Sequence, residues 1–308
     1  MNKRIFLIML AAVVLPLQAQ AEAVMLSAAS FREVSALISR SGAAEQTLLV
    51  MDDDDTLTMM PCSQPENPDK CQYLGGPAWS SWQQNLIGTS SPYRVAASDE
   101  ELFSITSVLF AMNFMAYSEP DLPAILQQLS SSGVRFVVET ARGGGDISAT
   151  ENQLENLQIT DASSSPFLHL ISAHALQMPS GQSSLASPFI PCALNNARPV
   201  SYRQGVMYVA GQNKGEMLLC LLSRAEPVRP VKHIVFVDDT DANVKDVYAA
   251  FKDNPDYQVS AVYYTRLEQH KAALTRGPMS EVYQKKADER WQALKSVLHS
   301  QLQWPSVQ

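Results

Sequence analysis

Short apolar runs alternate with amphipathic segments along most of the chain. Residues 47–51, 134–138 and 233–237 are apolar at nearly every position, and a fourth run spans 259–264. Strands that are covered by helices on both faces have this continuous pattern rather than a strict alternation. Because helical segments lie between the runs, the pattern predicts an α/β fold: a three-layer, Rossmann-like, mostly parallel sheet.

Local signals predict where the helices begin. Ser30 with Glu33 is a capping box whose helix ends near Gly42, and Ser98 with Glu101 opens a helix that runs to about residue 116. Thr150 with Gln153 predicts the start of a short helix in the same way. The other predicted elements are helices over 122–129, 214–222 and 242–251, short strands over 167–171, 202–207 and 208–210, and an amphipathic C-terminal helix over 282–302 that packs on the core.

The first 21 residues have the pattern of a secretory signal peptide. A basic start, Asn2-Lys3-Arg4, precedes an apolar run over 5–17, and Ala19-Gln20-Ala21 places small residues where a signal peptidase cleaves. The apolar run is shorter than the ~20 residues that span a bilayer as a helix. We therefore predict an exported protein, periplasmic or secreted, with no membrane segment after cleavage. An uncleaved anchor is the alternative.

The four cysteines fit an oxidising compartment, where an even number of cysteines is typical of disulfides. Cys62 and Cys71 bracket a short polar loop, so we predict that they pair. Cys192 and Cys220 remain, and the apolar surroundings of Cys220 are equally typical of a free thiol. No Cys-x-x-Cys motif is present, so the sequence supports neither a thioredoxin-like redox site nor a zinc knuckle.

Charge narrows the choice of partners. The chain has 31 acidic and 23 basic residues, a formal net charge of −8. No segment concentrates lysine and arginine enough to follow a phosphate backbone, so a nucleic-acid partner is disfavoured.

Acidic clusters follow two of the predicted strands. Asp52-Asp53-Asp54-Asp55 comes directly after residues 47–51, and Asp238-Asp239 comes directly after 233–237. If the chain continues in an extended form, Asp52 and Asp54 point the same way, into one crevice. Carboxylates at close range repel one another unless a cation lies between them, and hard oxygen ligands suit Mg²⁺. Because ligands bind at the carboxyl ends of parallel strands, the sequence predicts a magnesium site there.

These motifs resemble those of the haloacid dehalogenase superfamily of phosphohydrolases. Its first motif, Asp-x-Asp-x-Thr-Leu after an apolar strand, matches residues 52–57. Thr140 at the end of the next core strand, Lys214 at the start of a later helix, and the pair Asp238-Asp239 match the other three motifs in the same order. The order of the four motifs is the strongest evidence, because the second and third are weak alone.

The resemblance implies a role for each matched residue. Asp52 would be the nucleophile that forms an aspartyl-phosphate, and Asp54 would be the general acid and base. Thr140 and Lys214 would bind the phosphoryl group. Mg²⁺ would be held by the Asp52 carboxylate, the Asp54 main-chain carbonyl and Asp239, with Asp238 acting through water. Arg142 would either help to bind phosphate or form a surface salt bridge.

The resemblance also divides the chain. A core over 22–58 and 122–308 would carry the site, and residues 59–121 would form a cap inserted into it. Residues 162–201 would form a possible second, small insertion. One departure from the family is Asp55, which stands where many members have glycine.

The function that follows is a Mg²⁺-dependent phosphatase acting on a phosphomonoester, with a small phosphorylated compound or a phosphoprotein as substrate. Asp54 disfavours a dehalogenase, which lacks this second acid. The alternative is an exported binding or effector protein that keeps the fold with little or no catalysis.

Overall fold

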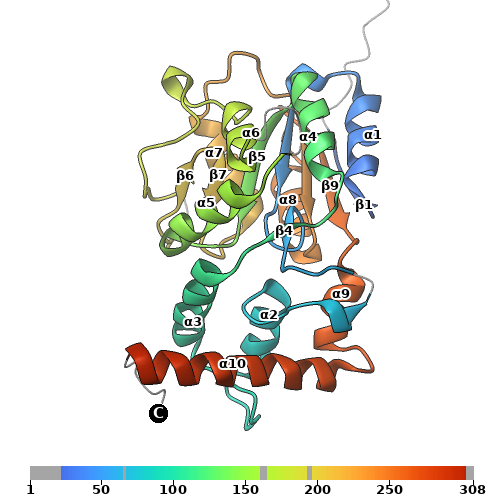
Figure 1. The fold of residues 1–308 in the computed structure, drawn as a ribbon. Coiled ribbons are helices and arrows are strands. Elements are labelled where there is room, and N and C mark those ends of the chain that lie inside the picture. The colour runs from blue at the N-terminus through green and yellow to red at the C-terminus, as the bar shows by residue number, and fades with distance from the viewer. Residues whose placement is uncertain (1–21, 65–66, 160–164, 193–195, 303–308) are drawn as a thin grey trace, which may run out of the picture.

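Seven strands form one sheet within the residues that the structure, a computed structural model, describes: 22–64, 67–159, 165–192 and 196–302 (Figure 1). Their order is β1-β9-β8-β2-β5-β7-β6, and every pair is parallel except β6 with β7. The strands are β1 (Ala23–Ala28), β2 (Thr47–Met51), β5 (Arg135–Thr140), β6 (Ser201–Arg203), β7 (Val206–Tyr208), β8 (His233–Asp238) and β9 (Gln258–Tyr264). The predicted α/β fold is confirmed.

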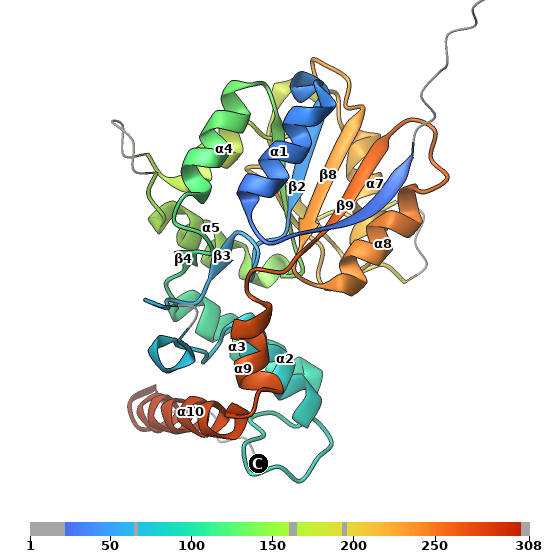
Figure 2. The ribbon, with the colours of Figure 1, turned by 90° about the vertical axis from the view of Figure 1, so that its right-hand side faces the viewer.

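Helices cover both faces of this sheet (Figure 2). One face carries α1 (Phe31–Ser41), α4 (Leu122–Ser131), α5 (Ile147–Asn156) and α6 (Phe167–Ala173), and the other carries α7 (Lys214–Arg224) and α8 (Asp241–Phe251). Successive residues of β2 bury themselves on alternate faces: Leu49 packs with the first group and Leu48 with the second. The two covered faces explain why these strands are apolar at most positions.

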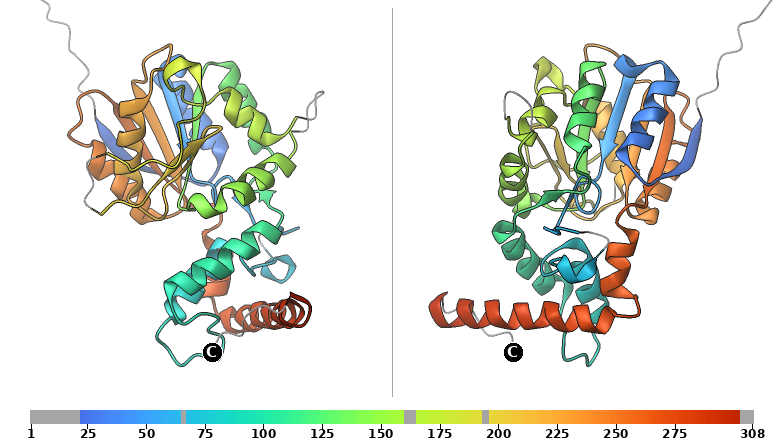
Figure 3. Two further views of the ribbon diagram at one scale, coloured as in Figure 1. Left: turned by 90° about the vertical axis from the view of Figure 1, so that its left-hand side faces the viewer. Right: turned by 45° about the vertical axis from the view of Figure 1, so that its right-hand side comes forward.

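Four further helices form a separate group, which we call the helical unit. Its members are α2 (Pro77–Leu86), α3 (Asp99–Met112), α9 (Glu268–Thr275) and α10 (Ser280–Leu302). The unit lies beyond the end of the sheet where β9 leads directly into α9 (Figure 2). Two further views show α10 on the side of the unit that faces away from the sheet (Figure 3).

The C-terminal helix is therefore confirmed, but its predicted packing on the sheet core is wrong. Buried residues of α10, among them Trp291, pack in the helical unit, where Trp291 and Trp79 have ring centroids 6.4 Å apart. The cause is that α2 and α3 have apolar residues of their own, which are buried against α10.

A two-stranded ribbon joins the start and the end of the inserted segment. β3 (Thr58–Met59) pairs antiparallel with β4 (Ala116–Tyr117), with Thr58 opposite Tyr117. The helical unit is thereby attached directly after the first acidic cluster.

Several local predictions differ from the structure. Residues 167–171 form part of α6 rather than a strand, because Phe167, Leu168 and Ile171 share one buried helix face. Thr150 lies inside α5 and does not cap it, and the strands β6 and β7 meet at a turn through Gly205, before the predicted division at residue 208. The sequence analysis missed β1, α2 and α9. Short 3₁₀ helices also occur at η1 (Ala44–Gln46), η2 (Pro68–Lys70), η3 (Gly144–Asp146) and η4 (Pro179–Gly181).

Both cysteine pairs are disulfides: the predicted Cys62–Cys71 bond is confirmed, and Cys192 bonds to Cys220, which is therefore not a free thiol. Disulfides are typical of proteins in an oxidising compartment. The predicted signal peptide, residues 1–21, lies outside the described residues. Within the described part of the chain, no helix has the length and apolar character needed to cross a membrane.

We predict that Gly215→Ala destabilises the protein by about 1–3 kcal/mol, because α7 and α8 are in direct contact at this glycine. A Cβ atom at Gly215 would lie 2.5 Å from the carbonyl oxygen of Asp246 and 2.7 Å from the Cβ of Ala250. Urea unfolding measures the effect. Gly145→Ala is the control, since a Cβ there would have no neighbour within 4 Å. Equal stability of the two variants would contradict the prediction.

Candidate functional site

The chain turns immediately after β2. The backbone N–H groups of Leu57 and Thr58 each donate to the carbonyl oxygen of Asp53 at 2.9 Å, and Asp55 has a left-handed φ of 62°. The expected extended continuation of the strand is therefore wrong. As a result Asp52 and Asp54 bind different partners.

Asp52 lies with Asp238 and Asp239 at the carboxyl ends of two adjacent strands. β2 pairs with β8 in parallel, and the Asp52 N–H continues the ladder by donating to the Val237 carbonyl at 2.9 Å. One carboxylate oxygen from each of the three aspartates lies within 4.8 Å of the others. We call this buried group the aspartate triad. Its oxygen donors can hold a metal ion.

Lys214 is the central cation of the site. Its Nζ donates to Asp52 Oδ1 at 2.5 Å and to Asp238 Oδ2 at 2.7 Å, and only 1% of the residue is exposed. Lys214 is the first residue of α7, and the Asn213 side chain caps this helix by accepting from the Glu216 N–H. The capped helix start holds the ammonium group between the two strand ends.

Burial and charge oppose each other in this group. Burial raises the pKa of Asp52 well above its ordinary value, Lys214 opposes the rise, and Asp238 and Asp239 add to it. Burial also disfavours the charged form of Lys214, but the attraction of Asp238 and Asp52 outweighs it and raises the Lys214 pKa. The three carboxylates outnumber the lysines that bind them, Lys214 and Lys271, and an excess of carboxylates is the condition that favours a cation.

A second lysine, which the sequence analysis missed, binds the triad from the helical unit. Lys271 of α9 donates from its Nζ to Asp239 Oδ2. Burial disfavours its charged form, but Asp239 and Asp55 raise its pKa. The Asp239 N–H donates to Thr56 Oγ1 at 3.1 Å. No motif marks Lys271; its position in the helix after β9, at the carboxyl end of the sheet, is the only signal that could have indicated it.

Asp54 lies apart from the triad and binds Arg142. The guanidinium donates to both carboxylate oxygens of Asp54, at 2.7 Å and 2.8 Å. The Arg142 Nη1 donates to Thr150 Oγ1 at 2.9 Å and to Gln153 Oε1 at 2.6 Å. Only 2% of the Arg142 side chain is exposed, so the predicted alternative of a surface salt bridge is wrong. Thr150 and Gln153, read from the sequence as a capping box, hold this arginine instead.

Thr140, the last of the predicted residues, lies at the same edge of the sheet, as does Asn243. Thr140 ends β5, is fully buried, and accepts from the Arg142 N–H at 3.3 Å. Asn243 donates to both carboxylate oxygens of Asp238, at 3.1 Å and 3.0 Å. Phosphate binding by Thr140, Lys214 and Arg142 stays a prediction.

The fold and this site define an α/β protein with buried carboxylates and lysines at the carboxyl ends of parallel strands. The chain belongs to the family described as "Protein of unknown function (DUF2608)", whose model matches residues 27–303. No curated protein and no solved structure matches the chain.

Glu139 is a further buried carboxyl group near Lys214. It is fully buried on β5, and neither carboxylate oxygen has a hydrogen-bond partner. Burial raises its pKa from 4.5 to about 8, although Lys214 opposes the rise. The folded protein therefore keeps a proton on Glu139 that the unfolded chain loses above pH 4.5.

We predict that Glu139→Gln removes a pH-dependent penalty. The folded state binds the extra proton between pH 4.5 and about 8, so wild-type stability falls as the pH rises through this window. Urea unfolding should show that the free energy of unfolding of the variant, relative to that of the wild type, rises by on the order of a few kcal/mol between pH 5 and pH 9. The control is Glu216→Gln, at an exposed position on α7. A difference that does not change with pH would count against the prediction.

Proposed function

We propose that the protein is a Mg²⁺-dependent phosphohydrolase of the haloacid dehalogenase type, acting on a phosphomonoester through an aspartyl-phosphate. The aspartate triad supports this proposal most directly: the first carboxylate after β2 lies with the acidic pair after β8, and Lys214 donates to both strand ends. The four motifs of the family therefore meet at one edge of the sheet rather than on separate surfaces.

The residues present fit a divalent magnesium ion. All donors of the triad are carboxylate oxygens, which Mg²⁺ prefers. Asp52 and Asp239 would hold the ion directly, Asp238 would act through water, and the main-chain carbonyl of Asp54 would be a further ligand. When bound, Mg²⁺ would reduce the repulsion between an anionic nucleophile and an anionic phosphate.

The reacting groups are Asp52 and Asp54. A carboxylate oxygen of Asp52 forms a bond to phosphorus, the bond from phosphorus to the ester oxygen breaks, and the leaving oxygen takes a proton from Asp54. Asp54 then accepts a proton from the water that cleaves the aspartyl-phosphate. Lys214 and Thr140 donate hydrogen bonds to the phosphoryl oxygens.

Arg142 holds Asp54 in this proposal. Because the guanidinium binds both carboxylate oxygens, Asp54 can contact the leaving oxygen of a substrate only when the contact with Arg142 loosens. The guanidinium lies 4.4 Å from the centre of the Phe110 ring, on α3 of the helical unit. We therefore assign the helical unit, whose helices α2 and α3 lie within the predicted cap of residues 59–121, as the cap that adjusts this contact when substrate binds.

The substrate is a small phosphorylated compound or a phosphoprotein outside the cytoplasm, as the predicted signal peptide indicates. The two disulfides support this location.

Asp52→Asn should lower the hydrolysis of an aryl phosphate at least about 10³-fold, because the amide cannot form the acyl phosphate. The mature chain is assayed for phosphate release with Mg²⁺ and again with a chelator. The matched control is Asp241→Asn, an exposed aspartate that pairs with Lys245 on α8. Two outcomes would favour the alternative function, an exported binding or effector protein with little or no catalysis. One is equal activity of Asp52→Asn and the wild type, and the other is a wild type without activity towards phosphomonoesters and phosphopeptides. Phosphate release that continues in the presence of the chelator would show that the reaction does not require Mg²⁺.

We also predict that Lys271→Met strengthens Mg²⁺ binding about tenfold, since the ammonium group and the ion compete for Asp239. Titration calorimetry measures the dissociation constant without any substrate. Lys285→Met is the control, because Lys285 is an exposed residue that pairs with Glu289 instead. Unchanged or weaker binding would show that Lys271 does not occupy the position of the ion.

A further inference from the structure

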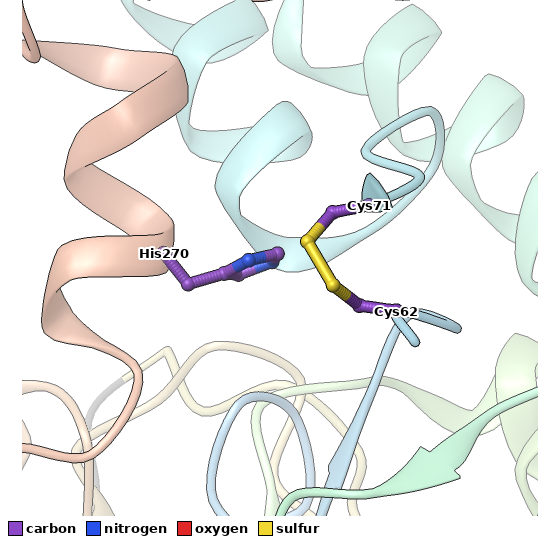
Figure 4. Close-up of side chains that lie close together, drawn as sticks. All are labelled: Cys62, Cys71 and His270. Atoms are coloured by element: carbon purple, nitrogen blue, oxygen red, sulfur yellow. A yellow bond between two sulfur atoms is a disulfide. The ribbon is translucent and has the colours of Figure 1, made fainter. Parts of the chain in front are cut away.

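Cys62, Cys71 and His270 form a second group of side chains that can act as metal ligands. One ligand atom from each lies within 4.8 Å of the others. The imidazole ring of His270 comes from α9 and points at the Cys62–Cys71 disulfide (Figure 4). This group lies in the helical unit and does not depend on the proposed function.

The imidazole is fixed in place but lacks a partner. Only 4% of His270 is exposed, and its buried Nδ1 makes no hydrogen bond. The ring stacks on Tyr73 with centroids 4.7 Å apart and planes 20° apart, and the Tyr73 hydroxyl donates to the His270 carbonyl at 3.1 Å. A buried nitrogen without a partner is costly, so the position of the imidazole that carries it, pointing at two sulfur atoms, needs a cause.

Backbone pairing also places the two cysteines side by side, in addition to the S–S bond. Cys62 and Cys71 form an isolated antiparallel bridge with Cα atoms 4.2 Å apart, and the Gln72 N–H donates to the Pro61 carbonyl at 3.4 Å. Cys71 is 5% exposed and belongs to the hydrophobic cluster of the helical unit, and Cys62 is half-buried and packs against that cluster. Cys62 is therefore the more exposed of the two cysteines.

We propose that reduction of the Cys62–Cys71 disulfide converts this group into a Zn²⁺ site with His270 as the third ligand. A dithiol reductant gives up two electrons and two protons, becomes a disulfide, and leaves two cysteine thiols. Zn²⁺ then displaces the two thiol protons and binds both sulfur atoms and the imidazole nitrogen.

The dimensions of the group suit this ion. Zn²⁺ binds sulfur at ~2.3 Å and nitrogen at ~2.0–2.1 Å in a tetrahedron, so its ligand atoms lie roughly 3.5–3.8 Å apart. The three atoms here are already within 4.8 Å of one another, so short side-chain movements complete the site.

The test is a Co²⁺ titration of the mature chain before and after reduction with a non-chelating phosphine. Tetrahedral Co²⁺ with sulfur ligands absorbs visible light, and Zn²⁺ should displace it and abolish the absorption. We expect one sulfur-bound ion, counted from this absorption, per reduced chain and none per oxidised chain; an ion at the aspartate triad has no sulfur ligand and does not contribute to this absorption. His270→Ala should weaken binding at least about tenfold. The matched control is His169→Ala, an exposed histidine on α6. A Cys192→Ser/Cys220→Ser double variant should bind as the wild type does.

Near-ultraviolet circular dichroism, which reports on the packing of Trp79 against Trp291, checks that the reduced chain keeps its fold. The proposal is overturned if the reduced chain does not develop the sulfur-ligand absorption, if reduction abolishes the dichroism signal, or if the oxidised chain develops the same absorption. Binding by His270→Ala that equals the wild type, or loss of binding in the double variant, also overturns it.

Discussion

The repulsion between carboxylates at two adjacent strand ends is the constraint on which the rest of this structure depends. Parallel pairing of β2 with β8 brings Asp52 beside Asp238 and Asp239, and all three aspartates are buried. Charges so placed are stable only with cations between them. Lys214 provides one from α7, and Lys271 provides another from α9. The sheet, the first turn of α7 and the position of α9 are thus joined by one electrostatic requirement.

This requirement also links the helical unit to the sheet. Lys271 binds Asp239 from α9, and Phe110 of α3 lies against the arginine that holds Asp54. Both contacts reach the site from the same group of helices. Any displacement of the helical unit therefore changes the charge next to Asp239 and the contact between Arg142 and Asp54. These two contacts are the physical basis for the proposal that the unit is a cap.

Sequence reasoning predicted the sheet and the residues that its strands carry, because both follow from the chain near each residue. A buried strand has a local pattern, and an aspartate directly after it lies at the carboxyl end of the sheet. Lys271 could not be found in this way, since only the packing of α9 brings it to Asp239. The packing of α10 in the helical unit and the hydrogen-bond partners of Arg142 are likewise set by tertiary contacts, which the local sequence does not show. The prediction of a strand over 167–171 was wrong for a different reason. A short apolar run fits a strand or a helix equally well, and here the burial of one helix face favours the helix.

Asp55 shows how the turn and the charges meet at one residue. Its φ of 62° is the left-handed conformation that glycine adopts without strain, which explains why glycine is frequent there in the family that the motifs resemble. Aspartate tolerates this conformation better than most residues. Its carboxyl group is buried, however, and Oδ2 has no hydrogen-bond partner. Burial raises the pKa of Asp55 well above its ordinary value, Asp239 adds to the rise, and Lys271 opposes it. The backbone alone would favour glycine here, and the aspartate is held beside the triad because Lys271 lies close enough to offset part of its charge.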